Sequence, residues 1–188
     1  MKTGIALFLG NVDSSMNYPE NTYPFRQDSD FLYFFGIDLP GFAGIMDFDS
    51  GNDYIFGNDL EIDHIIWMGI QPSVSELATK CGITVTLPSL KLTEVLTEAN
   101  RKGRKVHFLP PYRGETKLIL GSVLGKNPWS LNDLASVELI KAVISMRSVK
   151  EPIEIIEIEK AVDIAYEMHV TAMKMCKPGV KEQDILHT

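Results

Sequence analysis

Residues 23–36, YPFRQDSDFLYFFG, carry the strongest fold signal in this sequence. The stretch begins with polar residues and proline, and it becomes a compact run of aromatic side chains before a glycine. Ser29 has a side chain suited to a helix N-cap, and Gly36 suits the left-handed residue that ends a helix. We therefore predict a long loop over residues 11–26, followed by a short helix that ends at Phe35.

Outside this stretch, short apolar runs alternate with helical patterns. The predicted strands cover residues 4–9, 44–48, 53–56, 83–87 and 105–109. The predicted helices cover residues 73–82, 89–102, 114–124 and 131–146, the last capped by Ser130. Residues 49–52, DSGN, predict a hairpin turn, and residues 73–76, SVSE, predict a capping box. The alternation indicates an α/β domain with a mixed β-sheet flanked by helices.

Residues 151–180 predict one long amphipathic helix closed by a Pro-Gly pair. Its apolar stripe comprises Ile155, Ile158, Val162, Ala165, His169, Ala172 and Cys176. A helix with such a stripe has to pack on something, so we expect it to open a further domain that continues beyond Thr188. The predicted organisation is a domain over residues 1–146, then a linker and the first helix of a truncated domain over residues 147–188.

Composition narrows the classes of function. The net charge of −7 disfavours nucleic acid as a partner, because phosphate binding needs an excess of lysine and arginine. Cys81 and Cys176 lie far apart and form no CxxC motif, and no signal-peptide pattern occurs, so we expect a reducing, cytoplasmic setting. No apolar run approaches the roughly 18 residues of a membrane span.

Several short clusters invite a chemical interpretation, and each has a simpler alternative. Residues 59–64, DLEIDH, offer four possible metal ligands, but an acidic first helical turn is favoured. Residues 47–53 look like a calcium loop, yet Asn58 stands where the closing glutamate belongs, so a turn is favoured. The basic residues 101–105 fit the end of a helix. His169 is a ligand or a base, or a core histidine held by hydrogen bonds, and the core histidine is favoured.

Trp67 lies beside Gly69 in a loop context. It is either a lid on the local core or a platform for a ligand or partner. The residue pattern alone leaves both interpretations open.

Three segments in the same order resemble the Xaa-Pro aminopeptidase family, which includes aminopeptidase P, prolidase and creatinase. They are residues 23–36, residues 66–69 (IWMG), and a junction made of residues 146–150 (MRSVK), 154–155 and 172–179 (AMKMCKPG). The resemblance implies a ribonuclease-H-like N-terminal domain. It also implies a pita-bread catalytic domain beyond Thr188 that binds two divalent metals, usually manganese, through two Asp, one His and two Glu.

The resemblance assigns few residues within this chain. Trp67 matches a tryptophan that reaches towards an active site, often that of a neighbouring subunit, although a purely structural tryptophan stays open. Glu20 lies near the place of an acidic residue that helps to order the site. Tyr23, Arg26, Gln27 and Ser29 belong to the signature, and we expect them to order the loop and the helix cap.

The resemblance thus implies the N-terminal, non-catalytic domain of a metal-dependent Xaa-Pro aminopeptidase, which removes an N-terminal residue that precedes proline. The implied roles are oligomerisation and substrate access, and the chain alone is expected to be inactive. The implied partners are its own catalytic domain, other subunits of a homo-oligomer and proline-containing peptides, with no nucleic acid and no membrane. Two alternatives stay open: a non-enzymatic peptide- or protein-binding module of the same fold, and a creatinase or prolidase relative.

Overall fold

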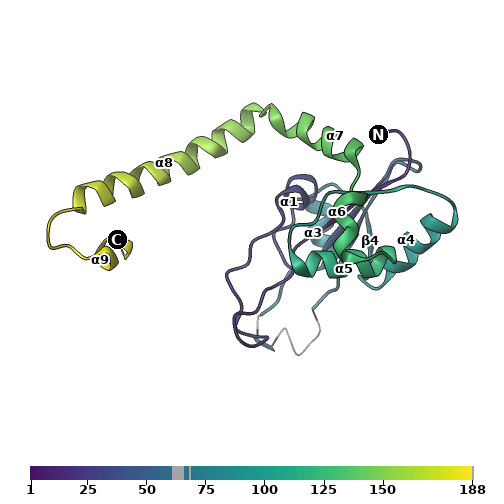
Figure 1. Ribbon diagram of the computed structural model, residues 1–188, viewed down its shortest axis with the longest axis horizontal. Helices are drawn as coiled ribbons and strands as arrows, with labels where there is room; N and C mark the ends of the chain where they lie inside the picture. Colours follow the sequence, from purple (N-terminus) through teal and green to yellow (C-terminus); the bar gives the residue numbers. More distant parts are fainter. Residues whose placement is uncertain (61–65, 68, 188) are drawn as a thin grey trace. The chain divides into compact units, whose positions relative to one another are not determined.

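The computed structural model describes residues 1–60, 66–67 and 69–187. Figure 1 shows its helices and strands along the chain. The chain divides into two compact units, Met1–Val143 and Ile144–Thr188, and each is described by itself. The predicted boundary between residues 146 and 147 stays a prediction.

A five-stranded mixed sheet with the order β4-β3-β2-β1-β5 forms the centre of the first unit. The strands are β1 (Ile5–Leu9), β2 (Ala43–Asp47), β3 (Asn52–Phe56), β4 (Val85–Leu87) and β5 (Val106–Phe108). β1 pairs antiparallel with β2 and parallel with β5, while β3 pairs antiparallel with β2 and parallel with β4. The predicted hairpin is confirmed, with each of its strands beginning one residue earlier than expected.

One face of the sheet is covered by α1 (Ser29–Phe35), α3 (Val74–Lys80) and α7 (Val137–Ser148). Phe8 of β1 packs there against the rings of Phe34 and Phe35, with ring centroids 4.8 and 5.7 Å apart. Gly44 of β2 lies directly under the Phe35 ring, which a Cβ at that position would overlap. The absence of a side chain therefore lets α1 approach the sheet closely.

The opposite face is covered by α4 (Lys91–Arg101), α5 (Gly114–Leu124) and α6 (Leu131–Leu134). Ile5 and Leu7 of β1 point to this face, while Ala6 and Phe8 point to the other, as the two-residue repeat of a strand requires. The sheet is therefore buried between two helical layers. The predicted fold class, a mixed sheet flanked by helices, is confirmed.

The predicted cap of α1 was wrong by one residue. Asp28 is the N-cap, because its Oδ1 accepts the backbone N–H groups of Asp30 and Phe31 at 3.0 and 2.9 Å. Ser29 is the first residue of the helix. A carboxylate one position earlier competes for the same amides, and it also favours the positive end of the helix dipole. Gly36 ends the helix in the left-handed conformation, as predicted.

The single helix predicted over residues 131–146 is two helices, α6 and α7. The break lies at Ala135 and Ser136, where the Ser136 N–H donates to the Phe108 carbonyl of β5 at 3.0 Å. Its hydroxyl oxygen accepts the Leu139 N–H at 3.3 Å and so caps the second helix. Ser130 is not the side-chain cap that we predicted, because its hydroxyl donates to the Asn127 carbonyl at 3.0 Å.

The second unit contains α8 (Pro152–Met175) and α9 (Glu182–Leu186). The long predicted helix is confirmed, and it begins with proline at its first position. α9 was not predicted. No residue of α8 is buried in this chain, and His169 is exposed. The interpretation of His169 as a core histidine stays a prediction. In the part of the chain that the structure describes, no helix has the length and apolar content needed to cross a membrane.

Candidate functional site

Gln27 ties both ends of the long loop to the segment that follows α1. Its side chain is buried, and its Oε1 accepts the backbone N–H of Asn11 at 2.7 Å and of Asp28 at 2.9 Å. Its Nε2 donates to the carbonyl oxygens of Ile37 at 3.0 Å and Leu39 at 2.8 Å. These four hydrogen bonds use both donors and both lone-pair positions of the amide. Gln27 thereby fixes the loop both where it leaves β1 and where it enters α1.

The other residues of the signature lie at the surface. The Arg26 side chain is exposed, and its backbone carbonyl accepts the Asn11 side-chain amide at 2.8 Å. Tyr23 is 56% exposed, and Ser29 is exposed at the start of α1. Of the four signature residues, Gln27 alone is buried, so it is the one whose contacts can hold the loop in place.

Residues 14–23 form a short ribbon within the long loop, called the 14–23 ribbon below. Ser15 and Thr22 form an antiparallel bridge, and the Tyr23 N–H donates to the Ser14 carbonyl at 2.9 Å. Glu20 lies near the tip of the ribbon and is exposed. The sequence predicted only an irregular loop here, because the ribbon lacks the alternating apolar residues that mark a strand.

Two side-chain contacts link the long loop to the segment after β5. The Ser14 hydroxyl donates to Glu115 Oε1 at 3.1 Å, and the Tyr112 hydroxyl donates to Asp28 Oδ2 at 3.2 Å. Hydrogen bonds from its own backbone N–H and from Ser14 hold the pKa of the Glu115 carboxyl below its ordinary value. The position of the 14–23 ribbon therefore depends on residues about a hundred positions away in the sequence.

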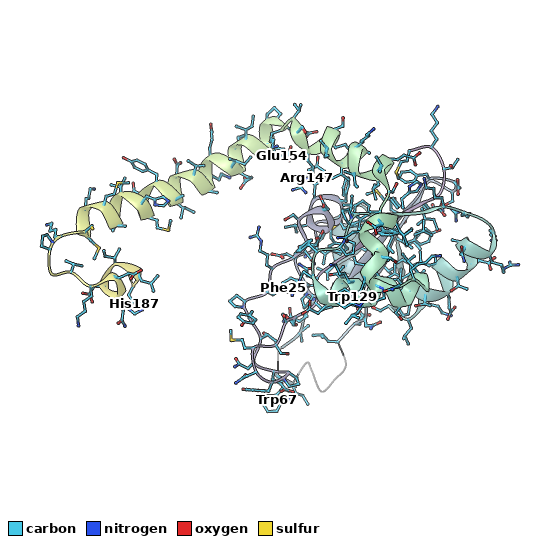
Figure 2. The ribbon with its side chains drawn as sticks, viewed as in Figure 1. Phe25, Trp67, Trp129, Arg147, Glu154 and His187 are labelled. Carbon is cyan, nitrogen blue, oxygen red and sulfur yellow. The ribbon has the colours of Figure 1, made fainter. Side chains whose placement is uncertain are left out.

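Trp67 lies between β3 and α3 and is 89% exposed. Residues 66 and 67 have helical conformation, so the predicted loop context of Trp67 was wrong. Figure 2 shows it at the outer end of the first unit, away from the sheet. Its neighbours Ile66 and Ile70 are also largely exposed. An indole with this exposure does not cover the core, so the interpretation as a core lid has no support in the structure. Trp67 and Glu20 lie on separate segments of the chain, whereas the four signature residues share one continuous segment.

The acidic turn between β2 and β3 is closed by an arginine. Arg104 contacts Asp47 through Nη2 and donates from Nε to Asp49 Oδ2 at 2.6 Å. Asp47 Oδ1 also accepts the backbone N–H groups of Asp49 and Ser50. Burial raises the pKa of Asp47, but the arginine and these backbone donors outweigh it, and the net pKa is lowered. The predicted turn is confirmed, and its carboxylates are occupied by protein partners.

The basic residues 101–105 are likewise paired with acidic side chains. Arg101 and Lys102 contact Glu98 at 2.7 and 3.1 Å, and Lys105 contacts Glu138 at 3.1 Å. Hydrogen bonds from Arg101 and then Lys102 lower the pKa of Glu98 to about 2. These ion pairs neutralise the cluster, whereas the sequence predicted only that its charges would complement the dipole at a helix end.

The side chains that could bind a metal ion do not cluster among the residues that the structure describes. Asp59, the first residue of the DLEIDH cluster, accepts the Val74 N–H of α3 at 2.7 Å. Residues 61–64 of that cluster lie outside the described residues. Among residues 1–60, 66–67 and 69–187, no three His, Cys, Asp or Glu side chains are close enough to share a metal ion.

Sequence reasoning missed a buried polar pair on the edge strand. His107 Nδ1 lies 2.7 Å from Ser136 Oγ, and burial lowers the pKa of the histidine. Neither residue belongs to a motif, and their partnership depends on the packing of α7 against β5. The sequence therefore contains no local signal that could have identified the pair.

Comparisons with known proteins give a consistent answer. A family model described as "Aminopeptidase P, N-terminal domain" matches residues 1–107. The chain is 24% identical over 190 residues to the Xaa-Pro aminopeptidase of Escherichia coli K12, covering 97% of the chain and 43% of that protein. It is 27% identical over 189 residues to the Xaa-Pro dipeptidase of Homo sapiens, covering 98% of the chain and 37% of that protein.

Solved structures of the E. coli aminopeptidase P share the fold. The low-pH form and the zinc-substituted enzyme with product each superpose with a TM-score of 0.77 at 24% identity. Each alignment covers 100% of this chain and 44% of the other chain. The chain thus spans less than half the length of the relatives it matches.

Proposed function

Because this chain belongs to the aminopeptidase P N-terminal domain family, we propose that it serves as the N-terminal, non-catalytic domain of a metal-dependent Xaa-Pro aminopeptidase. Such an enzyme removes an N-terminal residue that precedes proline. The observation that carries the proposal is the family match over residues 1–107, which includes β1 to β4 and most of β5. The proposed roles of the domain are to support oligomerisation and to shape access of proline-containing peptides to the active site.

The described residues do not fit the two divalent metals that the family implies. Asp47 and Asp49 are held by Arg104, and Asp59 accepts a backbone N–H of α3. No cluster of metal-ligand side chains occurs among the residues that the structure describes. We propose that the metals, in this proposal manganese, belong to the catalytic domain, and we assign no metal-assisted step to this chain.

Trp67 is the proposed contact with a neighbouring subunit or its substrate. The support is its 89% exposure together with the exposure of Ile66 and Ile70, two apolar residues nearby in the sequence. The flat face of an indole suits a proline ring or an apolar surface. Glu20 is exposed near the tip of the 14–23 ribbon, and we propose that it helps to order the site.

We propose the cytoplasm as the compartment. Cys81 and Cys176 are free, which suits a reducing environment. Fractionation of the source cells followed by an antibody against this chain tests the assignment.

A peptidase assay tests the non-catalytic role. The purified chain, supplied with Mn²⁺ and a tripeptide whose second residue is proline, should release no N-terminal amino acid above a protein-free blank. Metal-dependent release that increases with the amount of chain would overturn the proposal. A metallopeptidase of the family, assayed in parallel, shows that the conditions support hydrolysis.

Light scattering at increasing concentration tests the oligomeric role. The wild-type chain should show an average mass above 21.0 kDa that rises with concentration. Trp67→Ala should lower the fraction of oligomer, because it removes a large apolar side chain that is 89% exposed. Trp129→Ala is the matched control, since Trp129 is also exposed, at 77%, but lies elsewhere.

Two results would contradict this part of the proposal. A wild-type monomer at every concentration would exclude self-association through this chain. An equal loss of oligomer in the Trp67 and Trp129 variants would show that any exposed tryptophan contributes, and that Trp67 has no particular role.

An Xaa-Pro dipeptidase is the second candidate for the parent activity. The observation in its favour is the 27% identity to the human Xaa-Pro dipeptidase over 189 residues. Substrate length separates the two in the native enzyme: hydrolysis of a free Xaa-Pro dipeptide marks a dipeptidase, whereas hydrolysis only of longer Xaa-Pro peptides marks an aminopeptidase.

A further inference from the structure

His107 joins three segments that are distant in the sequence. It lies on β5, at the edge of the sheet, and its side chain is only 3% exposed. Nδ1 lies 2.7 Å from the hydroxyl oxygen of Ser136, immediately before α7. The other side of the ring faces the chain before β1, where a Cβ on Gly4 would lie 3.2 Å from Nε2 and the Thr3 backbone hydrogen-bonds the ring.

The direction of the hydrogen bonds follows from the cap of α7. The Ser136 hydroxyl oxygen accepts the Leu139 N–H at 3.3 Å, which leaves the single hydroxyl hydrogen free to donate. Its nearest acceptor is His107 Nδ1. The ring is therefore assigned as neutral, with its hydrogen on Nε2, and the Thr3 backbone accepts that hydrogen. In this state Ser136 caps α7 and anchors the helix to β5 at the same time.

Three charged groups surround the ring. Glu138 of α7 has its Oε2 3.7 Å from His107 Nδ1. Lys105, just before β5, pairs with Glu138. The N-terminal amine of Met1 acts on the ring at longer range. Burial lowers the pKa of His107 below its ordinary value, and Lys105 lowers it further. Glu138 and the Thr3 hydrogen bond act in the opposite direction but do not restore it.

Adding a proton to Nδ1 changes this arrangement. The ring would then donate to Ser136, and the Ser136 oxygen would accept from both Leu139 and the ring. The hydroxyl hydrogen would lose its acceptor in a buried position, which is unfavourable. Glu138 would be drawn from Lys105 towards the imidazolium ring.

We propose that the His107–Ser136 pair is a proton-sensitive clasp that holds the N-terminal end of α7 on β5 and loosens when Nδ1 gains a proton from solvent. Because the neutral ring is favoured in the folded chain, the clasp is complete above the ordinary histidine pKa of 6.5. It weakens as the pH falls below that value towards the lowered pKa of His107 in the folded chain. α7 carries Leu139 and Val143 into the core and continues to Ser148, which belongs to the second unit. The clasp therefore lies at the start of the helix that leads out of the first unit.

Amide hydrogen exchange of the whole chain by NMR tests the proposal, between about pH 7.5 and about pH 5.5. After correction for intrinsic rates, the protection factor of the Leu139 amide should fall about threefold or more on acidification. The Leu96 amide of α4, which lies on the opposite face of the sheet, should keep its protection. His107→Gln, which keeps a neutral polar side chain, should abolish the fall.

His169→Gln is the matched control, because it removes an exposed histidine from α8 by the same substitution. It should respond to pH like the wild type. A flat Leu139 protection factor in the wild type, or an unchanged fall in His107→Gln, would overturn the proposal. If His107→Gln does not fold, an NMR titration of the wild-type chain tests the proposal instead. The His107 ring and the Leu139 amide resonances should then titrate with the same midpoint. Separate midpoints would overturn the proposal.

Discussion

At the scale of single residues, Gln27 shows how one buried amide can organise a long loop. Its four hydrogen bonds go to backbone groups at the start of the loop, directly after the loop and beyond α1. Each of those backbone groups would otherwise need another partner in a place with little access to water. The loop is therefore held by a side chain rather than by a strand.

Gln27→Met should destabilise the chain by about 2–4 kcal/mol, because it keeps the size of the side chain but leaves buried backbone donors and acceptors without a partner. Urea unfolding followed by circular dichroism measures the free energy of unfolding. Arg26→Met is the control, since the neighbouring side chain is exposed, and it should change that free energy little. Equal effects of the two substitutions would contradict the role assigned to Gln27.

The same residue marks a limit of prediction from sequence. The sequence signature identified Gln27 as a structural residue, but not its four partners, since Ile37 and Leu39 come close only when α1 folds. Arg104 was interpreted as one charge of a helix end, whereas it closes a turn at Asp47. Asp28 replaced Ser29 as the cap because two adjacent residues offered suitable side chains, and the sequence could not rank them.

At the scale of helices and strands, features whose interacting residues lie close together in the sequence were the easiest to predict. The capping box of α3 pairs Ser73 with Glu76: the Ser73 hydroxyl accepts the Glu76 N–H at 3.2 Å, and Glu76 Oε2 accepts the Ser73 N–H at 2.8 Å. Both partners lie within one turn, so their spacing in the sequence was sufficient. The break between α6 and α7 was missed because it depends on a hydrogen bond to β5.

Ser73→Ala should lower the free energy of unfolding by about 1 kcal/mol, the usual effect of losing an N-cap side chain. Ser75→Ala, two residues further into the same helix, is the matched control and should have little effect because its side chain is exposed. Chemical denaturation of both variants measures the difference. A control as unstable as the cap variant would mean that helix α3 responds to any loss of serine.

Gly44→Ala should destabilise the chain by about 3 kcal/mol or more, because the added methyl group would overlap the buried Phe35 ring and push α1 away from β2. Gly114→Ala is the control: no heavy atom lies within 4 Å of its added Cβ, and the residue begins α5. Thermal unfolding of the two variants should therefore differ clearly. A tolerated Gly44→Ala would mean that α1 does not pack on the sheet as described.

At the scale of the whole molecule, carboxylates with lowered pKa values determine the response to acid. Asp47, Glu76, Glu98, Glu115 and Glu138 all have pKa values below their ordinary 3.8 or 4.5. At pH values near these ordinary pKa values, the folded chain therefore binds fewer protons than the unfolded chain. The stabilisation that the ionised carboxylates give the folded chain is lost as the pH falls below those values. Asp53 acts in the opposite direction, because burial raises its pKa.

We expect the thermal midpoint of unfolding to fall steeply between about pH 5 and about pH 3. Arg104→Gln should reduce this dependence, because Asp47 loses the arginine that helps to lower its pKa. Arg101→Gln is the comparison, since its partner Glu98 lies in an exposed helical pair. A midpoint that stays constant over this range, or a wild-type slope in Arg104→Gln, would contradict the assignment.

The strand order has a consequence for the time course of folding during synthesis. β1 can pair with β2 as soon as the hairpin emerges from the ribosome, but its other edge waits for β5, where Ile5 pairs with Val106. At typical rates of translation this edge stays unpaired for on the order of 5–20 s. An apolar strand with open backbone groups is a template for pairing with other chains. During this interval, β1 of one nascent chain is most exposed to pairing with a strand of another nascent chain on the same messenger RNA. The interval ends when β5 pairs with β1.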